Sequence, residues 1–358
     1  MKHIELFAGI GGFRRALDLL TQDDVMRFES VAFSEIDNSA SKTYKANFDI
    51  SPSEIEMGDI VAFTHDENNI KSLPDFDLLT AGFPCQAFSM MGKQQGFNED
   101  RGQMFFRIKD ILEVKRPKYV LLENVKNLYT HDKGNTFKVI KNDLESLGYH
   151  VYSAIFNTSS FHLPQTRNRV LIFATTESGH DWLNEEFNCD IISTFFDSAY
   201  HETSVIAFDS VLDLLAKDVD KKYFLSERIK PTILSDGSGG FKSRSDIDLR
   251  IARPLTATMH KMHRACQDNY YSQDFINTEG RNRPSESLTK EELAKLPIRR
   301  LTPAEAFALQ GFPMEFAKCA AEKKVADGAL YKQAGNAVSV NVIYAVLYFL
   351  ICKGIIKE

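Results

Sequence analysis

Residues 4–13 read Ile4-Glu5-Leu6-Phe7-Ala8-Gly9-Ile10-Gly11-Gly12-Phe13, and they decide the class of fold. The first four residues form an apolar run typical of a buried strand, and a helical pattern begins at Phe13. The glycines between them lie where the backbone must turn tightly and approach a ligand closely. A strand that passes through such a turn into a helix is the opening unit of an α/β protein.

The alternation of short apolar runs and longer helical patterns continues to about residue 174. We expect strands at Ile4–Phe7, Ser30–Phe33, Leu78–Ala81, Tyr119–Leu122 and Arg169–Phe173. We expect helices at Phe13–Leu20, Asn38–Phe48, Met104–Lys115 and Thr136–Leu147. This order predicts a doubly wound, mostly parallel sheet with helices on both faces.

The regular alternation stops after Ala174 and is followed by an irregular region with a Gly/Ser-rich passage at 235–240. Helical periodicity returns at Thr302-Pro303-Ala304-Glu305, where Thr302 and Glu305 can form a capping box. We therefore predict a first domain over residues 1–176, a second, smaller and irregular domain with its hinge over 177–320, and a segment over 321–358 that rejoins the first domain.

The composition is that of an ordinary soluble globular protein, with 43% hydrophobic and 26% charged residues among 358. A net charge of −6 argues against non-specific coating of nucleic acid by the whole surface, although basic residues cluster between Lys242 and Arg300. The N-terminus lacks a secretory pattern, and the most apolar stretch, Val342–Cys352, is too short to span a bilayer. We expect a cytoplasmic protein without a membrane segment, in which that stretch is a buried helix.

The five cysteines form no C-x-x-C pair and have no neighbouring histidine cluster, so we expect neither a metal site nor a disulfide framework. Four of them fit small buried residues: Cys189, Cys266, Cys319 and Cys352. Cys85 does not fit this description. It follows the strand Leu78–Ala81 in Gly82-Phe83-Pro84-Cys85-Gln86-Ala87-Phe88-Ser89, at the sheet edge where α/β enzymes place their sites.

The glycine turn at 7–13 does not match G-x-G-x-x-G, which argues against a dinucleotide and favours a nucleoside without phosphates. Glu35, just past the second strand, is placed to accept hydrogen bonds from ribose hydroxyls. Asp59 is a candidate for the adenine amino group. Each residue alone fits a simple turn or cap, but their succession at strand ends predicts a cofactor cleft.

Glu123 ends the strand Tyr119–Leu122, and a carboxylate so close to a buried strand indicates a functional group beside Cys85. Arg167 and Arg169 precede and enter the next strand two residues apart, so they point to the same side of an extended segment. They are candidates to hold an anionic or carbonyl-bearing substrate. An arginine that pairs with Glu123 to hold the site together is compatible with this role.

These motifs, in this order, resemble the DNA (cytosine-5) methyltransferases of bacterial restriction–modification type. The resemblance rests on Phe7–Phe13, Gly82–Ser89, Arg101–Phe106, Glu123–Val125, Gln165–Val170, Arg300–Pro303 with Leu309–Pro313, and Gln333–Val338. It implies a Rossmann-like fold that binds S-adenosyl-L-methionine, with a target-recognition domain in the middle segment. It also implies methyl transfer to C5 of a cytosine flipped out of a specific duplex DNA sequence.

The resemblance assigns roles to individual residues. Cys85 would add to C6 of cytosine while Glu123 supports protonation at N3, with Arg167 as the main arginine at the base and Arg169 in support. The implied cofactor residues are Phe7, Gly9, Ile10, Gly12, Glu35, Ile36, Asp59, Ile60, Pro84, Met104, Asn336, Ala337 and Val338. The implied DNA contacts are Gln86, Ser89, Arg253 and Thr256.

Two rival functions are weighed against this one. Relatives with the same catalytic core methylate cytosine in transfer RNA, but their short recognition segment with a Cys-Phe-Thr motif is not apparent here. A non-catalytic regulator that holds cofactor or flipped bases is disfavoured by the intact Cys85, Glu123 and Arg167. We expect a monomer that acts on double-stranded DNA, and a cognate restriction endonuclease would share its system without binding it.

Overall fold

The computed structural model describes residues 1–84, 104–237 and 243–357. By its internal contacts the chain forms two compact units. Unit 1 comprises residues 1–161, 168–205 and 338–358, and unit 2 comprises residues 162–167 and 206–337. Unit 1 is thus assembled from three separate stretches of the chain.

Unit 1 is built on a seven-stranded sheet with the order β3-β2-β1-β4-β5-β7-β6. Its strands are β1 (Lys2–Leu6), β2 (Glu29–Phe33), β3 (Ile55–Glu56), β4 (Leu78–Gly82), β5 (Tyr119–Val125), β6 (His150–Asn157) and β7 (Asn168–Thr175). Neighbours from β3 to β5 are parallel, whereas β7 is antiparallel to both β5 and β6. The predicted mostly parallel sheet is confirmed.

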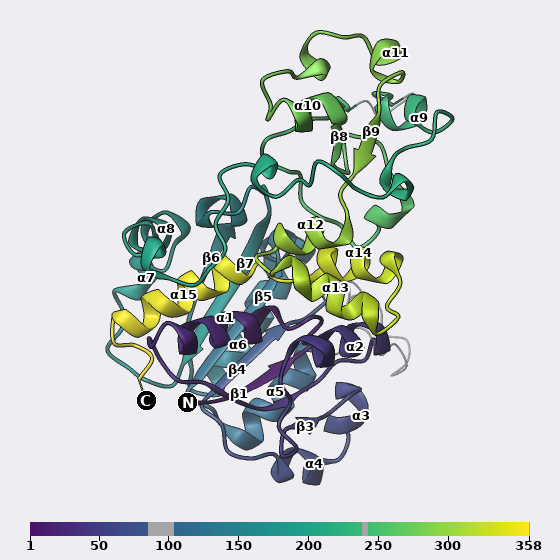
Figure 1. Cartoon of the computed structure of the whole chain (residues 1–358). Coiled ribbons are helices and arrows are strands. Elements are labelled where there is room, and N and C mark those ends of the chain that lie inside the picture. The colour runs from purple at the N-terminus through teal and green to yellow at the C-terminus, as the bar shows by residue number, and fades with distance from the viewer. Residues whose placement is uncertain (85–103, 238–242, 358) are drawn as a thin grey trace. The chain divides into compact units, whose positions relative to one another are not determined.

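Helices cover both faces of this sheet, as Figure 1 shows. They are α1 (Gly12–Gln22), α2 (Asn38–Asn47), α3 (Ile60–Thr64), α4 (Glu67–Ser72), α5 (Met104–Lys115), α6 (Asn135–Ser146), α7 (Leu183–Glu186), α8 (Cys189–Asp197) and α15 (Val340–Cys352). Residues Val120 and Leu122 of β5 join a core cluster with α5 and α6, while the alternate residue Tyr119 stacks on Phe173. Side chains of one strand therefore point into two apolar layers, which explains why β5 is buried along most of its length.

The C-terminal helix α15 lies beside α1 in unit 1 (Figure 1). The hydroxyl of Tyr344 donates to Oδ2 of Asp23 at 2.7 Å, just after α1 ends. Among the described residues, the segment 327–352 is apolar and long enough to cross a membrane, but 78% of its most apolar window is buried within the protein, as in a core helix. The expected buried helix is α15.

Unit 2 is made of short elements around a small apolar core. They are α9 (Lys230–Leu234), β8 (Tyr270–Ser272), α10 (Gln273–Asn277), α11 (Lys290–Leu293), β9 (Ile298–Arg300), α12 (Pro303–Ala308), α13 (Met314–Glu322) and α14 (Asp327–Asn336). The expected capping box at α12 is present, because the Thr302 hydroxyl accepts from Glu305 N and the Glu305 carboxylate accepts from Thr302 N. The same carboxylate receives two hydrogen bonds from the buried Arg299, at 2.8 and 2.9 Å.

Candidate active site

The carboxyl ends of β1, β2, β4 and β5 lie at one edge of the parallel part of the sheet. In the register of β4 and β5, Gly82 is the partner of Glu123. The loop that leaves β4 therefore starts beside the acid at the end of β5. Cys85, Gln86 and Ser89 lie outside the described residues, and the last described residue before them is Pro84, which is exposed.

Asn124 fixes the start of that loop. Its amide Nδ2 donates to the carbonyl of Phe83 at 2.9 Å, and its Oδ1 accepts from Val125 N at 2.8 Å. Asn124 is buried, so these hydrogen bonds are protected from competition with water. An amide that follows an acid at a strand end is the sequence signal for such a positioning residue.

The loop after β1 has the left-handed conformation that its glycines predict. Phe7, Gly9 and Gly11 have φ values of 55°, 57° and 79°. A Cβ on Gly11 would lie 2.2 Å from the ring of Phe48, and one on Gly12 would lie 2.4 Å from Cγ2 of Val338. The loop thus packs tightly on its protein side, and no larger residue fits at these two positions without movement.

Glu35 is held by backbone amides on both of its carboxylate oxygens. Oε2 accepts from Gly9 N at 2.7 Å, and Oε1 accepts from Asp37 N at 2.6 Å. These two hydrogen bonds fix the carboxylate at the carboxyl end of β2, against the loop after β1. The next side chain, Ile36, is 70% exposed, an apolar surface that a flat ring would cover. Both features fit a nucleoside.

The remaining predicted cofactor residues differ in whether their side chains or only their backbone atoms are accessible to a ligand. Asp59 caps α3, with Oδ1 accepting from Val61 N at 2.9 Å, whereas Ile60 is buried in the core, so only its backbone is suited to a ligand contact. Ile10 is buried in the loop, and Met104 packs against the core at the start of α5. In unit 2, Asn336 ends α14 and is exposed, while Ala337 is buried.

A buried carboxyl lies beneath the loop after β1. Glu5 on β1 is 1% exposed, and the hydroxyl of Tyr44 donates to its Oε2 at 3.4 Å. Burial raises the pKa of Glu5 from 4.5 to about 8, although the nearby Arg14 opposes this shift. A charged residue inside an otherwise apolar strand is the sequence signal for this group, and Glu5 was not among the predicted site residues.

The raised pKa of Glu5 predicts a pH-dependent stability. The folded protein binds the Glu5 proton more tightly than the unfolded chain, so this group stabilises the fold below about pH 4.5 and progressively less as the pH rises towards 8. Chemical denaturation of wild type and Glu5→Gln at pH 5, 6.5 and 8 should show the wild type losing stability relative to the variant. A difference that stays constant over this range would contradict the assignment.

Glu123 and Arg169 form an ion pair at the end of β5. Nε of Arg169 lies 2.9 Å from Oε1 of Glu123, and their side chains are 21% and 10% exposed. The other oxygen of Glu123 would lie 3.7 Å from a Cβ on Gly82, so the carboxylate stands next to the residue that opens the β4 loop. The arginine keeps this nearly buried carboxylate oriented towards that loop.

Arg167 has a different environment from Arg169. It is 1% exposed in unit 2, and its terminal nitrogens donate to the carbonyls of Leu255, Gly335 and Ala337 at 2.8–3.1 Å. The carbonyl-rich surroundings identify Arg167 as a clamp between two backbone segments of its unit. Of the two arginines, Arg169 is the one for which the structure describes an ion pair with Glu123.

Arg167→Ala should therefore destabilise unit 2. Each buried carbonyl left without a donor costs about 1–3 kcal/mol, so we expect the free energy of unfolding to fall by at least about 2 kcal/mol. Arg169→Ala is the matched comparison, and it should lower activity with a smaller effect on stability. Denaturant unfolding of both variants measures this, and an Arg167→Ala protein as stable as wild type would refute the clamp.

The predicted DNA contacts Arg253 and Thr256 also lie in unit 2. NH1 of Arg253 donates to the backbone carbonyl of Asp246 at 3.0 Å. The backbone of Thr256 is so close to Gly335 that a Cβ there would lie 2.2 Å from it, and the buried Thr256 hydroxyl has no hydrogen-bond partner among the described residues. The described contacts of both residues therefore lie within unit 2.

The expectation that the four other cysteines are small buried residues is wrong for Cys352, which is exposed, and Cys189, Cys266 and Cys319 are only partly buried. Cys352 is near the end of α15, where the helix surface reaches solvent. Its exposure makes it a matched control for Cys85.

Comparisons with known proteins identify the family. The model of the C-5 cytosine-specific DNA methylase family matches residues 1–352. The type II methyltransferase M1.ScrFI of Lactococcus lactis subsp. cremoris is 39% identical over 345 residues, covering 96% of this chain and 76% of that protein. M.HpaII of Haemophilus parainfluenzae is 36% identical over 351 residues, covering 96% and 87%.

Solved structures agree in fold. The S. pombe Dnmt2 methyltransferase has a TM-score of 0.73 at 20% identity and covers 99% of both chains. The Entamoeba histolytica methyltransferase EhMeth has a TM-score of 0.73 at 21% identity and covers 100% of this chain and 99% of its own. With the family model matched over nearly the whole length, the chain belongs to the C-5 cytosine-specific DNA methylases.

Proposed function

We propose that this protein transfers the methyl group of S-adenosyl-L-methionine to C5 of a cytosine in a specific duplex DNA sequence. The observation that carries the proposal is the pair of Glu123 and Arg169 at the end of β5, beside the Gly82–Pro84 entry to the Cys85 loop. A nearly buried acid next to a loop that bears a thiol is what a nucleophilic addition to a pyrimidine requires.

The chemistry follows from the weak nucleophilicity of C5. The thiolate of Cys85 adds to C6 of cytosine, while Glu123 supports a proton at N3, so that the electrons of the C5–C6 double bond become available at C5. Bound S-adenosyl-L-methionine supplies an electrophilic methyl group on a sulfonium centre. Once the methyl group is on C5, the cofactor is left as its neutral thioether. Loss of the C5 proton to water then restores the C5–C6 double bond and expels the Cys85 thiolate.

Arg169 orients the acid in this scheme, while Arg167 binds backbone carbonyls of unit 2. Both remain predicted arginines of the catalytic site. Glu35 with Ile36 and the Phe7–Gly12 loop hold the nucleoside part of the cofactor. Their fit is supported by the carboxylate of Glu35, which is tied to the Gly9 amide of that loop, and by the exposed side chain of Ile36. Asp59, the Ile60 backbone, Pro84, Met104 and Asn336–Val338 are the further predicted cofactor residues.

Residues 177–320 are proposed to recognise the target, with Gln86, Ser89, Arg253 and Thr256 as predicted DNA contacts. The basic cluster between Lys242 and Arg300 supports phosphate positioning. Because C5 is hidden in a stacked duplex, the cytosine must leave the helix, which costs a few kcal/mol that protein contacts offset. We propose that the protein acts as a monomer, since one site serves one cytosine. The proposed compartment is the cytoplasm.

The test is transfer of labelled methyl groups from S-adenosyl-L-methionine to mixed-sequence duplex DNA and, separately, to transfer RNA. The expected result is label at C5 of cytosine in DNA within one sequence context. Label found only in transfer RNA would replace the proposal by the RNA alternative. Binding of cofactor without transfer to either substrate would favour the non-catalytic regulator.

A further inference from the structure

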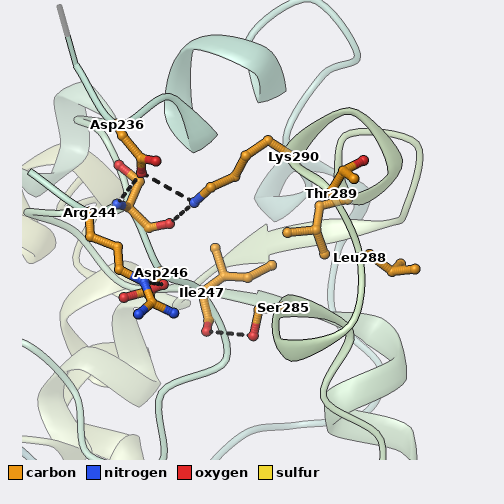
Figure 2. A pocket seen from close by; sticks show the side chains of 10 residues that line it. Asp236, Arg244, Asp246, Ile247, Ser285, Leu288, Thr289 and Lys290 are labelled. Carbon is orange, nitrogen blue, oxygen red and sulfur yellow. Dashed lines mark hydrogen bonds and ion pairs between the residues drawn. The ribbon is translucent and has the colours of Figure 1, made fainter.

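The segment 244–247 of unit 2 alternates between more exposed and buried side chains. Ser245 and Ile247 are 0% and 1% exposed, whereas the side chains of Arg244 and Asp246 are 81% and 28% exposed. Successive side chains of an extended chain point to opposite sides, so Arg244 and Asp246 share the outward side. There the Nε of Arg244 donates to Oδ1 of Asp246 at 2.9 Å (Figure 2).

The backbone on both sides of Arg244 is fixed by hydrogen bonds to Asp236. The amide of Ser243 donates to the Asp236 carbonyl at 2.9 Å, and the amide of Ser245 donates to Oδ1 of Asp236 at 2.6 Å. The ammonium of Lys290 donates to the carbonyl of Ser245. Arg244 therefore projects from a rigid support, which lowers the entropic cost of presenting it to a ligand.

The backbone at Asp246 is also fixed by hydrogen bonds. Its backbone carbonyl accepts from Arg253, and the carbonyl of the following Ile247 accepts from the hydroxyl of Ser285 at 3.2 Å. Arg253 thus supports the residue that orients Arg244. The carboxylate of Asp246 fixes the plane of the guanidinium through Nε and directs its two terminal nitrogens away from the backbone.

Arg244 and Asp246 line a pocket of about 250 Å³, together with Asp236, Ile247, Leu288 and Lys290 (Figure 2). Among the described residues, open space therefore lies beside the guanidinium, where a flat polar edge can approach it. Other arginines of the basic cluster are engaged by the fold: Arg299 with Glu305, Arg250 with the carbonyl of Gly280, and Arg283 with Glu286. Arg244 combines high exposure with a fixed orientation.

We propose that Arg244, oriented by Asp246, reads a guanine of the DNA target by donating two hydrogen bonds to its O6 and N7 atoms. Guanine is the base that presents two acceptors side by side in the major groove, and a planar guanidinium matches them. This assignment rests on the proposed DNA methyltransferase activity and names one of its specificity-determining residues. An exposed ion pair contributes little to stability, so variants at these positions should fold.

The first experiment compares methylation profiles over a library of duplexes that carry every single-base change in the wild-type target. Arg244→Ala should lose discrimination at one guanine, by roughly 5- to 150-fold as for one bidentate base contact. Asp246→Asn should relax the same position to a smaller degree. The matched control is the exposed Lys261, whose replacement by Ala should either leave the profile shape unchanged or lower binding to all sequences alike.

The second experiment separates a direct contact from an indirect effect. Each guanine of the target is replaced in turn by 7-deazaguanine, which lacks the N7 acceptor. The wild type should lose activity at the guanine that Arg244→Ala relaxes, and the variant should lose no more on that substrate, because the two changes remove the same hydrogen bond.

Three outcomes overturn the proposal: an unchanged profile in Arg244→Ala, a uniform loss over all sequences, or additive losses with 7-deazaguanine. A uniform loss would assign Arg244 to the phosphate backbone. Failure of the wild type to methylate any duplex would instead reject the proposed function, so the two failures are distinguishable.

Discussion

Cys85→Ser is expected to reduce methyl transfer to duplex DNA by about 10⁴-fold or more, in the range seen when the covalent nucleophile of an enzyme is removed. A serine hydroxyl is not ionised near neutral pH and has no base beside it in the proposed mechanism, whereas a thiol ionises readily. The measurement is the single-turnover rate with labelled S-adenosyl-L-methionine, with cofactor binding checked separately. Binding should be retained, because the thiol acts on the base.

The control for this variant is Cys352→Ser, which changes the same chemical group at an exposed position near the end of α15. It should transfer methyl groups at the wild-type rate. Duplex DNA with 5-fluorocytosine at the target offers a second readout, since fluorine cannot leave C5 as a proton does. The wild type should form a stable covalent complex with this DNA and Cys85→Ser should not. Rapid transfer by Cys85→Ser would remove Cys85 from the mechanism.

Glu123→Gln is expected to lower the rate of methyl transfer by about 10²–10⁴-fold, the usual contribution of a positioned acid or base. Glutamine keeps the size of the side chain but cannot exchange a proton with N3 of cytosine. The loss should appear in kcat more than in KM, because the proton at N3 matters in the transition state. Steady-state kinetics on the mapped target measure both parameters.

The matched control for Glu123→Gln is Glu113→Gln, which neutralises an exposed carboxylate on α5 and should leave both parameters unchanged. Thermal unfolding excludes a loss of fold in Glu123→Gln, whose partner Arg169 is 21% exposed and can be solvated. If the whole loss appeared as a rise in KM with an unchanged kcat, Glu123 would bind the base without assisting its chemistry.

Most of the sheet was predictable from the sequence because its central strands are buried on both faces. The helix predicted over Met104–Lys115 has those bounds in the structure, and the strand predicted over Tyr119–Leu122 extends to Val125. The strand His150–Asn157 was missed. Several of its side chains are only half-buried because it lies at the sheet edge, so its apolar pattern is weaker.

The arrangement of the site was less predictable than its residue types. Glu123 and the Phe7–Gly12 loop follow from their positions at strand ends, which all parallel strands share. The roles of Arg167 and Arg169 did not follow from a spacing of two residues. Their environments depend on β7, which pairs Arg169 with the end of β5, and on unit 2 carbonyls that come about 90 to 170 residues later in the chain.

The packing of α1 against α15 has a consequence for biosynthesis. A ribosome delivers α1 early, but α15 follows all of unit 2 in the chain, and the hydrogen bond from Tyr344 to Asp23 joins residues 321 positions apart. During translation the apolar face of α1 therefore lacks its final partner, α15, while unit 2 is being made. Nascent chains fold by domains as they emerge, so unit 2 is able to form before the last stretch of unit 1 is available. Unit 1 therefore cannot complete its core until the last residues of the chain have been made.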